Sequence, residues 1–354
     1  MKKKVLLGMS GGVDSSASAI LLKEQGYEVI GATMSLWDDE KEEGGCGSSA
    51  AVEDAKKVCE ILGISHYVFD FRETFQSCVI RDFIECYQNA MTPNPCIECN
   101  KYLKFRAFYQ KAQELGCEYM ATGHYAKVEY CEKYQQYVLK AAKAEKKDQS
   151  YVLYNIPKDL LPHILFPLSD FDNKDQIREL AMKKGLTIAN KPDSQEICFI
   201  PDNDYRKFLR EYGNQKVKTG NIVNQKGEVI GKHKGLIYFT IGQRKGLGIT
   251  WPVPLYVIDL DPKRNEVVVG EEKELYTQEL VADQLNYLLM EDQQGPIEIK
   301  AKIRYSSKPA EATLYKEAAE ARVKFKTPQR AVTKGQSVVF YIEDSIVLGG
   351  GKIK

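Results

Sequence analysis

A short segment rich in glycine and serine, residues 10–16 (SGGVDSS), constrains the fold more than any other part of the chain. It follows an apolar run at residues 5–7 and precedes a helical pattern that begins near Ser15 and is closed by Gly26. Backbone N–H groups, hydroxyls and the N-terminus of a helix can all bind phosphate oxygens in such a loop. The segment lacks the lysine of a Walker A loop and the G-x-G-x-x-G spacing of dinucleotide folds. It therefore predicts a pyrophosphate site of another type.

The first 200 residues alternate short apolar runs with helical patterns. The predicted strands are 5–7, 27–34, 67–71 and 119–122, and further predicted helices are 50–62, 75–89 and 102–115. This order predicts an α/β domain with a mainly parallel sheet and helices on both faces.

From residue 217 onward the pattern changes to short β-branched and aromatic runs separated by glycine and proline. They predict strands at 221–223, 236–241, 255–260, 266–269, 297–303, 321–325 and 337–342. Many short strands are typical of small β-barrels or sandwiches. We therefore expect a catalytic nucleotide-binding domain over 1–204, a central β domain over 205–277 and a C-terminal β-barrel over 278–354, with residues 271–280 as a linker.

The 354 residues have a net charge of only +1, which by itself indicates no nucleic-acid partner. Residues 205–250, however, hold ten basic residues and only two acidic ones. The basic group Lys232, His233, Lys234, Arg244 and Lys245 predicts a surface that tracks phosphates, and the alternative is a solvated face. The N-terminal apolar run is too short for a signal peptide, and no run approaches the ~20 residues of a membrane span, so we expect a cytosolic protein.

Two cysteine segments suggest further chemistry. Residues 92–101 (TPNPCIECNK) form a proline-stiffened loop that leads into a helix, where the helix dipole and nearby lysines favour a thiolate. The C-x-x-C spacing of Cys96 and Cys99 fits a zinc half-site, a redox pair or an iron–sulfur half-site. Residues 191–200 (KPDSQEICFI) carry the lone Cys198. The helical patterns around Cys59, Cys78, Cys86 and Cys117 favour a structural role for those thiols.

These motifs, together with 121–125 (ATGHY), 147–151 (KDQSY), 242–248 (GQRKGLG) and 347–351 (VLGGG), resemble the bacterial tRNA-specific 2-thiouridylase family over essentially the whole chain. SGGVDS is similar to the PP-loop of ATP pyrophosphatases, which cleave ATP between its α and β phosphates. The resemblance implies that the C2 oxygen of the wobble uridine in tRNAs for Glu, Gln and Lys is adenylated with ATP and Mg²⁺. Sulfur then replaces that oxygen, and AMP leaves.

The resemblance also implies roles for individual residues. Asp14, Cys99 and Cys198 would be catalytic, with Cys198 taking persulfide sulfur from a cysteine desulfurase or relay protein and Cys99 releasing it or closing a disulfide. ATP would bind at Gly8, Met9, Ser10, Gly11, Gly12, Val13, Asp14, Ser15, Met34 and Gly123. The flipped-out base would meet Asn94, Pro95 and Cys96, and tRNA would contact His124, Lys147, Asp148, Gln149, Arg304, Tyr305 and Gln336. The implied protein is a monomer.

Cys96 departs from part of that family, in which some members have aspartate at this position. Cys96, Cys99 and Cys198 together could hold a 4Fe-4S cluster with one open iron, so a persulfide relay and a cluster mechanism both remain open. Two other functions also remain: an amidotransferase-type PP-loop synthetase, and an RNA-binding protein with a degenerate nucleotide fold. The intact SGGVDS segment argues against the second.

Overall fold

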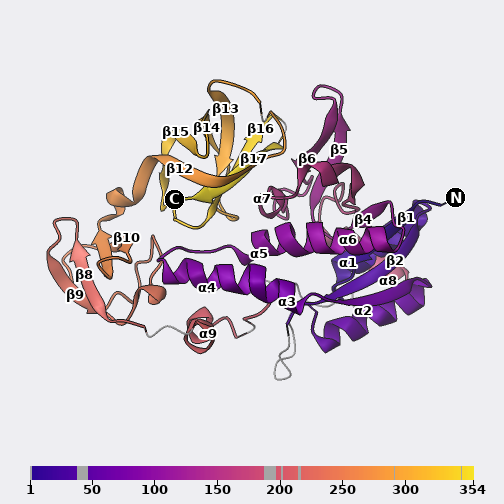
Figure 1. Ribbon diagram of the computed structural model, residues 1–354, viewed down its shortest axis with the longest axis horizontal. Coiled ribbons are helices and arrows are strands. Elements are labelled where there is room, and N and C mark those ends of the chain that lie inside the picture. The colour runs from indigo at the N-terminus through magenta and orange to yellow at the C-terminus, as the bar shows by residue number, and fades with distance from the viewer. Residues whose placement is uncertain are drawn as a thin grey trace. The chain divides into compact units, whose positions relative to one another are not determined.

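The computed structural model describes residues 2–37, 47–186, 197–200, 202–213, 217–290, 292–343 and 345–354. The chain divides into two compact units, whose elements are labelled in Figure 1. Unit 1 comprises residues 1–79, 96–203 and 343–347, and unit 2 comprises residues 80–95, 204–342 and 348–354. None of the helices within the described ranges is long and apolar enough to cross a membrane.

Unit 1 is built on a five-stranded parallel sheet in the order β3-β2-β1-β4-β7. The strands are β1 (Lys4–Gly8), β2 (Glu28–Ser35), β3 (Ser65–Asp70), β4 (Tyr119–Ala121) and β7 (Ile164–Leu165). Val5, Leu6 and Leu7 of β1 are completely buried, as expected for a central parallel strand covered on both faces. The predicted α/β class of this region is confirmed.

The helices of unit 1 follow from the strand order. The chain crosses the sheet from β1 to β3 through α1 (Val13–Glu24) and α2 (Ser49–Leu62), then returns to β4 on the other side of β1. Because such crossovers are right-handed, α1 and α2 cover one face and the helix that leads to β4 covers the other. α8 (Lys174–Lys183) packs against α1. Unit 1 also contains α3 (Arg72–Phe75), α7 (Ser150–Leu153), η3 (Lys158–His163) and the hairpin β5 (Ala126–Cys131) and β6 (Gln136–Ala141).

Two predicted helices are divided by π-helical turns. The helix expected at 75–89 is α3, then the π-helix η1 (Gln76–Ile80), then α4 (Arg81–Gln88), which belongs to unit 2. The helix expected at 102–115 begins earlier, as α5 (Pro95–Glu98), and continues as the π-helix η2 (Cys99–Ala107) and α6 (Phe108–Glu114). Pro95 is tolerated at the first helical position because the N–H that it lacks has no partner there. π-helical turns are rare and frequent at functional sites.

Unit 2 begins, after α4, with α9 (Tyr205–Tyr212) and a four-stranded sheet in the order β10-β11-β8-β9. Its strands are β8 (Gly220–Asn224), β9 (Val229–His233), β10 (Tyr256–Asp261) and β11 (Glu266–Gly270). Ile222, Val257 and Val267 are fully buried in its core. α4 and α9 pack through aromatic rings, with the Phe83 and Phe208 centroids 6.0 Å apart.

The rest of unit 2 is a closed six-stranded barrel. Its strands are β12 (Tyr276–Tyr287), β13 (Ile297–Lys302), β14 (Ala310–Lys316), β15 (Ala321–Arg330), β16 (Ser337–Ile342) and β17 (Ile346–Ile353). The order is β12-β15-β14-β13-β16-β17, and β12 closes the ring because it also pairs with β17. Val323, Phe325 and Phe340 are buried in it. The prediction of two small mainly-β domains after the α/β domain is confirmed.

One strand predicted for unit 2 is wrong. Residues 236–241 contain the 3₁₀ turn η5 (Leu236–Tyr238) in place of a strand, because Gly235 at φ 152° turns the chain just before it. The expected linker, residues 271–280, contains η6 (Glu272–Leu275) and the start of β12. Strands β5, β6, β9, β12, β14 and β17 were not predicted, because charged or glycine residues interrupt their apolar pattern.

Candidate functional site

The loop between β1 and α1 lies where the strand order reverses, because β2 and β3 follow on one side of β1 and β4 and β7 on the other. β1 is flanked by β2 and β4, so the loop after β1 and the loop after β4 open at the same crevice beyond the carboxyl ends of the strands. Gly123, which follows β4, lies against the start of α1. A Cβ atom on Gly123 would lie 3.0 Å from the carbonyl carbon of Asp14 and from the amide nitrogen of Ser15. The structure therefore brings Gly123 together with the predicted phosphate loop.

Internal hydrogen bonds shape the phosphate loop. The Ser10 amide donates to Ser15 Oγ over 3.2 Å, and the hydroxyls of Ser15 and Ser16 donate to the Gly12 carbonyl over 3.1 and 2.9 Å. Gly11 has φ +67°, and a Cβ atom there would lie 2.6 Å from the Ala51 carbonyl oxygen of α2. A side chain at position 11 is excluded on both grounds. Gly12 caps α1 without a side-chain hydrogen bond, which leaves the helix N-terminus to bind an anion.

The remaining predicted ATP residues surround this loop. Gly8, the last residue of β1, pairs with Ala32 of β2, and Met34 lies two residues further along β2. Met9 and Val13 are buried, at 2% and 3% exposure, so their side chains belong to the core and only their backbone groups remain for a nucleotide.

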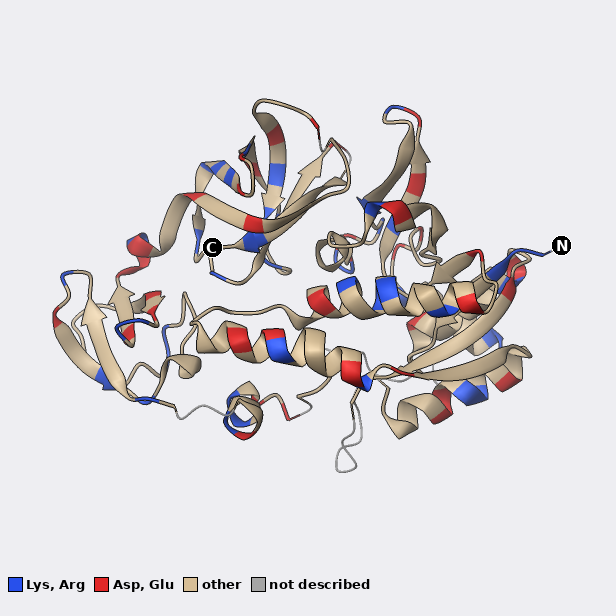
Figure 2. Cartoon of the chain, in the orientation of Figure 1, with Lys and Arg blue, Asp and Glu red and all other residues tan. Residues whose placement is uncertain are grey.

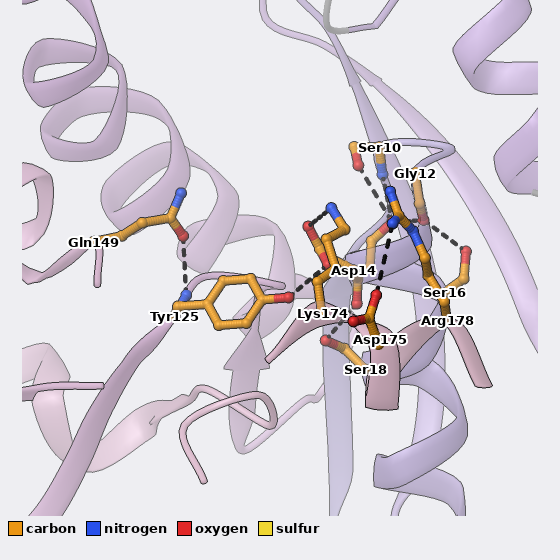
Figure 3. Close-up of polar contacts among 11 residues, drawn as sticks. Ser10, Gly12, Asp14, Ser16, Ser18, Tyr125, Gln149, Lys174, Asp175 and Arg178 are labelled. Atoms are coloured by element: carbon orange, nitrogen blue, oxygen red, sulfur yellow. Dashed lines mark hydrogen bonds and ion pairs between the residues drawn. The ribbon is translucent and has the colours of Figure 1, made fainter. Parts of the chain in front are cut away.

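Asp14 is held by two side chains that the motif does not contain, as Figure 3 shows. The Tyr125 hydroxyl donates to Asp14 Oδ1 over 2.8 Å, and Lys174 Nζ lies 3.0 Å from Asp14 Oδ2. The backbone of Tyr125 is fixed in turn by Gln149. The Gln149 side-chain Oε1 accepts from the Tyr125 backbone amide over 2.9 Å, and the Gln149 backbone amide donates to the Tyr125 carbonyl over 2.8 Å. Sequence analysis missed the roles of Tyr125 and Lys174. Tyr125 belongs to the segment 121–125 (ATGHY) described above. No local sequence pattern links Lys174 to the phosphate loop, which lies 160 residues away in the sequence.

The predicted tRNA residues of unit 1 take part in internal contacts. Asp148 Oδ1 accepts from the amides of Ala142 and Ser150, each over 3.1 Å, so its carboxylate organises the turn that carries Lys147 and Gln149. The His124 imidazole Nδ1 lies 2.7 Å from Thr122 Oγ1.

His124 packs against the rings of Phe105 and Phe166, whose centroids are 6.0 and 6.1 Å from its own. Loss of hydration there, with a smaller effect of Lys104, holds the pKa of His124 well below its usual range. His124 is therefore a neutral imidazole at neutral pH.

The cysteines of the predicted sulfur site lie in two segments of unit 1. Cys96 is exposed on α5 and Cys99 is buried at the first position of η2. The π-helix η2 that begins at Cys99 also carries the basic residues Lys101, Lys104 and Arg106. Cys198 is half-buried in a turn, where its neighbour Phe199 packs against Phe75 with centroids 5.6 Å apart. Residues 191–196 of the predicted Cys198 segment lie outside the described residues.

No disulfide joins any two of the described cysteines. Across the described ranges, no three His, Cys, Asp or Glu side chains are grouped so that they could hold a metal ion.

The cysteines outside the sulfur site behave as the sequence predicts. Cys59, Cys86 and Cys117 are buried, and Cys78 is half-buried. Burial raises the pKa of the Cys59 thiol to about 12 and that of Cys86 to about 11, so these thiols are unreactive.

In unit 2, Gln336 is the predicted tRNA residue with the clearest internal role. Its Nε2 donates to the carbonyls of Thr92 and Pro93 over 3.0 and 3.1 Å, and the Thr92 amide donates to the Lys334 carbonyl over 2.8 Å. The turn before β16 thus holds the residues that lead to Asn94, Pro95 and Cys96. Arg304 is half-buried, and Tyr305 is 45% exposed with Lys302 Nζ 5.5 Å from its ring centroid.

One member of the predicted basic surface is placed wrongly. His233 is 3% exposed, packs on Phe239 and donates from Nε2 to the Asn265 carbonyl over 3.1 Å. Burial lowers its pKa, so it adds no positive charge at neutral pH. Lys232, Lys234, Arg244 and Lys245 are exposed as predicted.

The parallel sheet, the phosphate loop at the start of α1 and the two β domains define a nucleotide-binding protein of the PP-loop class. Residues 3–202 match the family model described as tRNA methyl transferase HUP domain. Residues 206–271 match the tRNA methyl transferase PRC-barrel domain, and residues 277–353 match the aminomethyltransferase beta-barrel domain.

Curated relatives match along the full length of the chain. The chain is 50% identical to the tRNA-specific 2-thiouridylase MnmA of Clostridioides difficile, over 100% of this chain and 99% of that protein. It is 52% identical to the MnmA of Clostridium botulinum, over 100% of this chain and 98% of that protein. Among solved structures, NMN synthetase from Francisella tularensis matches with a TM-score of 0.35 and 18% identity, over 61% of this chain and 79% of that one. The chain belongs to the tRNA-specific 2-thiouridylase MnmA family.

Proposed function

We propose that this protein is a tRNA-uridine 2-sulfurtransferase that adenylates the wobble uridine of tRNA with ATP and then replaces its C2 oxygen by sulfur. The observation that carries the proposal is the loop between β1 and α1, which presents hydroxyls and a helix N-terminus at the crevice between the loops after β1 and β4. Full-length identity of 50 to 52% to curated MnmA proteins supports the same reaction.

The first step makes the C2 oxygen a leaving group. That oxygen attacks the α-phosphorus of ATP, the bond between this phosphorus and the bridging oxygen breaks, and pyrophosphate leaves with the electron pair while N3 of the base loses its proton. The loop residues Gly8 to Ser15, with Met34 and Gly123, bind the nucleotide, and amide donors at the helix N-terminus stabilise the charge that develops. The carboxylate of Asp14 fits Mg²⁺, which prefers oxygen ligands and would neutralise phosphate charge.

The second step uses thiols alone. Cys198 carries a persulfide, the Cys99 thiolate attacks its inner sulfur, and hydrosulfide leaves as a Cys99–Cys198 disulfide forms. Hydrosulfide attacks C2 and AMP leaves, while an external thiol reduces the disulfide. Asn94, Pro95 and Cys96 lie against the base, and a cysteine desulfurase or relay protein supplies the persulfide.

The other assignments follow from the same proposal. Residues 1–204 form the catalytic domain, and 205–277 and 278–354 form two β domains that contact tRNA. His124, Lys147, Asp148, Gln149, Arg304, Tyr305 and Gln336 are the proposed tRNA contacts. The substrates are tRNAs for Glu, Gln and Lys, and the protein acts as a cytoplasmic monomer.

The test is pyrophosphate release and 2-thiouridine formation from ATP, tRNA transcript, a cysteine desulfurase and cysteine. We expect both products from a tRNA with uridine at the wobble position, and neither from the same tRNA with cytidine there. Asp14→Asn should remain folded in thermal melting and release no pyrophosphate. Pyrophosphate release that requires a small carboxylate and ammonia, with tRNA having no effect, would instead indicate an amidotransferase-type synthetase.

Cys96 separates the relay from the cluster mechanism in the same assay, with protein prepared without oxygen. We expect iron-free Cys96→Ala to keep most thiolation, and Cys99→Ala and Cys198→Ala to lose it. Wild-type protein that is active only when loaded with iron would overturn the relay.

A further inference from the structure

The phosphate loop contains no cation of its own. Asp14, an anion, is the single charged residue from Gly8 to Ser16. A triphosphate carries several negative charges, so Asp14 repels it wherever neither Mg²⁺ nor a positive side chain from elsewhere in unit 1 offsets the charge. The structure supplies that charge from α8, the helix that packs against α1.

Lys174 is the first residue of α8 and is only 9% exposed at its side chain, with Nζ 3.0 Å from Asp14 Oδ2. The position is fixed, because the side chain of Asn173 caps the helix by accepting from the amides of Asp175 and Gln176 over 3.1 and 3.2 Å. Burial of an ammonium group away from water costs free energy unless anionic groups contact it.

Arg178 lies one turn further along α8, on the same face as Lys174. Among the described residues, its guanidinium makes one long contact, to Asp175, with 3.9 Å between Nη1 and Oδ1, and its Nε is buried with no hydrogen-bond partner there. In the view of Figure 3 the Lys174 and Arg178 side chains both extend from α8 toward the segment that holds Ser10, Gly12 and Asp14. A guanidinium with an unsatisfied donor is suited to phosphate oxygens.

We propose that Lys174 and Arg178 bind the triphosphate of ATP, so that α8 supplies the positive charge that the loop lacks. In the free protein Lys174 neutralises Asp14. When the nucleotide enters, phosphate oxygens take the ammonium group, and the Tyr125 hydroxyl continues to hold Asp14. The inference rests on the proposed function, since it requires ATP in this loop.

The test compares affinities for ATP and adenosine without added Mg²⁺, so that a metal ion held by Asp14 does not contribute. Loss of a charged contact to phosphate should weaken ATP binding about tenfold or more in Lys174→Met, and measurably in Arg178→Met, while adenosine binding is unchanged. Adenosine binding also reports that each variant is folded. The matched control is Lys184→Met, an exposed lysine of the same region that pairs with Glu24.

A purely structural role for Lys174 predicts a different result. If Lys174 only neutralises Asp14, then Lys174→Met should have no effect on the ratio of ATP to adenosine affinity in an Asp14→Asn background. We expect the ratio still to fall about tenfold there, and an unchanged ratio would overturn the inference. Wild-type protein that gives no tRNA-dependent pyrophosphate release would refute the proposed function instead, whatever the ratio.

Discussion

Gly123 and Asp14 show how single residues define the site. A Cβ at position 123 would lie 3.0 Å from the backbone of α1, a contact tighter than most, so glycine favours the close approach of the loop after β4 to the phosphate loop. Asp14 has one oxygen bonded to Tyr125 and the other to Lys174, so its carboxylate is fixed before any ligand binds. Preorganisation of this kind lowers the cost of binding, because the side chain has no freedom left to lose.

His124 makes the stability of unit 1 depend on pH. The folded protein keeps it neutral, because burial holds its pKa well below the ordinary value. The unfolded chain takes up a proton as the pH falls below about 6.5, so folding loses stability there, by up to about 1.4 kcal/mol per pH unit. We expect the melting temperature of wild-type protein to fall more between pH 7.5 and 5.5 than that of His124→Gln. Parallel curves for the two proteins would contradict this assignment.

At the scale of elements, the sequence predicted regular segments and missed interrupted ones. The strands β1 and β2 and the helices α1 and α2 have continuous patterns, and their predicted positions agree with the structure within two residues. The barrel strand β12 begins with exposed polar residues and contains a register shift between Thr277 and Glu279, so it lacks a continuous alternating pattern. The π-helix η2 could not be predicted, since residue periodicity does not distinguish it from an α-helix over two turns.

The candidate site shows the same limit. The loop residues were found because they are adjacent in sequence, and their types suit phosphate directly. Tyr125, Lys174 and the contact of Gln336 with residues 92–93 depend on the tertiary fold, which joins segments more than 100 residues apart. Burial of His233 likewise depends on its packing against Phe239 and cannot be deduced from neighbouring charges.

The turn before β16 should control the segment that leads into α5. Gln336→Leu removes two hydrogen bonds to the carbonyls of Thr92 and Pro93. We expect a loss of about 1–3 kcal/mol in stability, because two partly buried carbonyls lose their donor. Thiouridine formation should also fall, because Asn94, proposed to contact the base, and Cys99, proposed to release the sulfur, follow this segment. The matched control is Gln329→Leu in the same barrel, whose side chain bonds the nearby Thr327 carbonyl. Equal effects of the two substitutions would refute a special role for Gln336.

At the scale of the whole molecule, positive charge is local and not general. The chain has 50 basic and 49 acidic residues, and in Figure 2 both signs occur along α2. The central β domain differs, since Lys232, Lys234, Arg244 and Lys245 are all exposed within a segment that has few acidic residues. A neutral protein with one basic surface can bind a polyanion in a defined orientation, which a uniformly basic protein cannot do as selectively.

Replacement of Lys232, Lys234, Arg244 and Lys245 by glutamine should therefore weaken tRNA binding and flatten its dependence on salt. Each phosphate contact releases counterions, so the loss of four contacts lowers the slope of log K against log salt by roughly three to four. Fluorescence anisotropy of labelled tRNA at several salt concentrations measures the slope, and ATP binding should be unchanged. The control replaces Lys56, Lys57, Lys183 and Lys184, four exposed lysines of unit 1, and should leave the slope intact. The same slope in both quadruple variants would mean that the central stretch is only a solvated face.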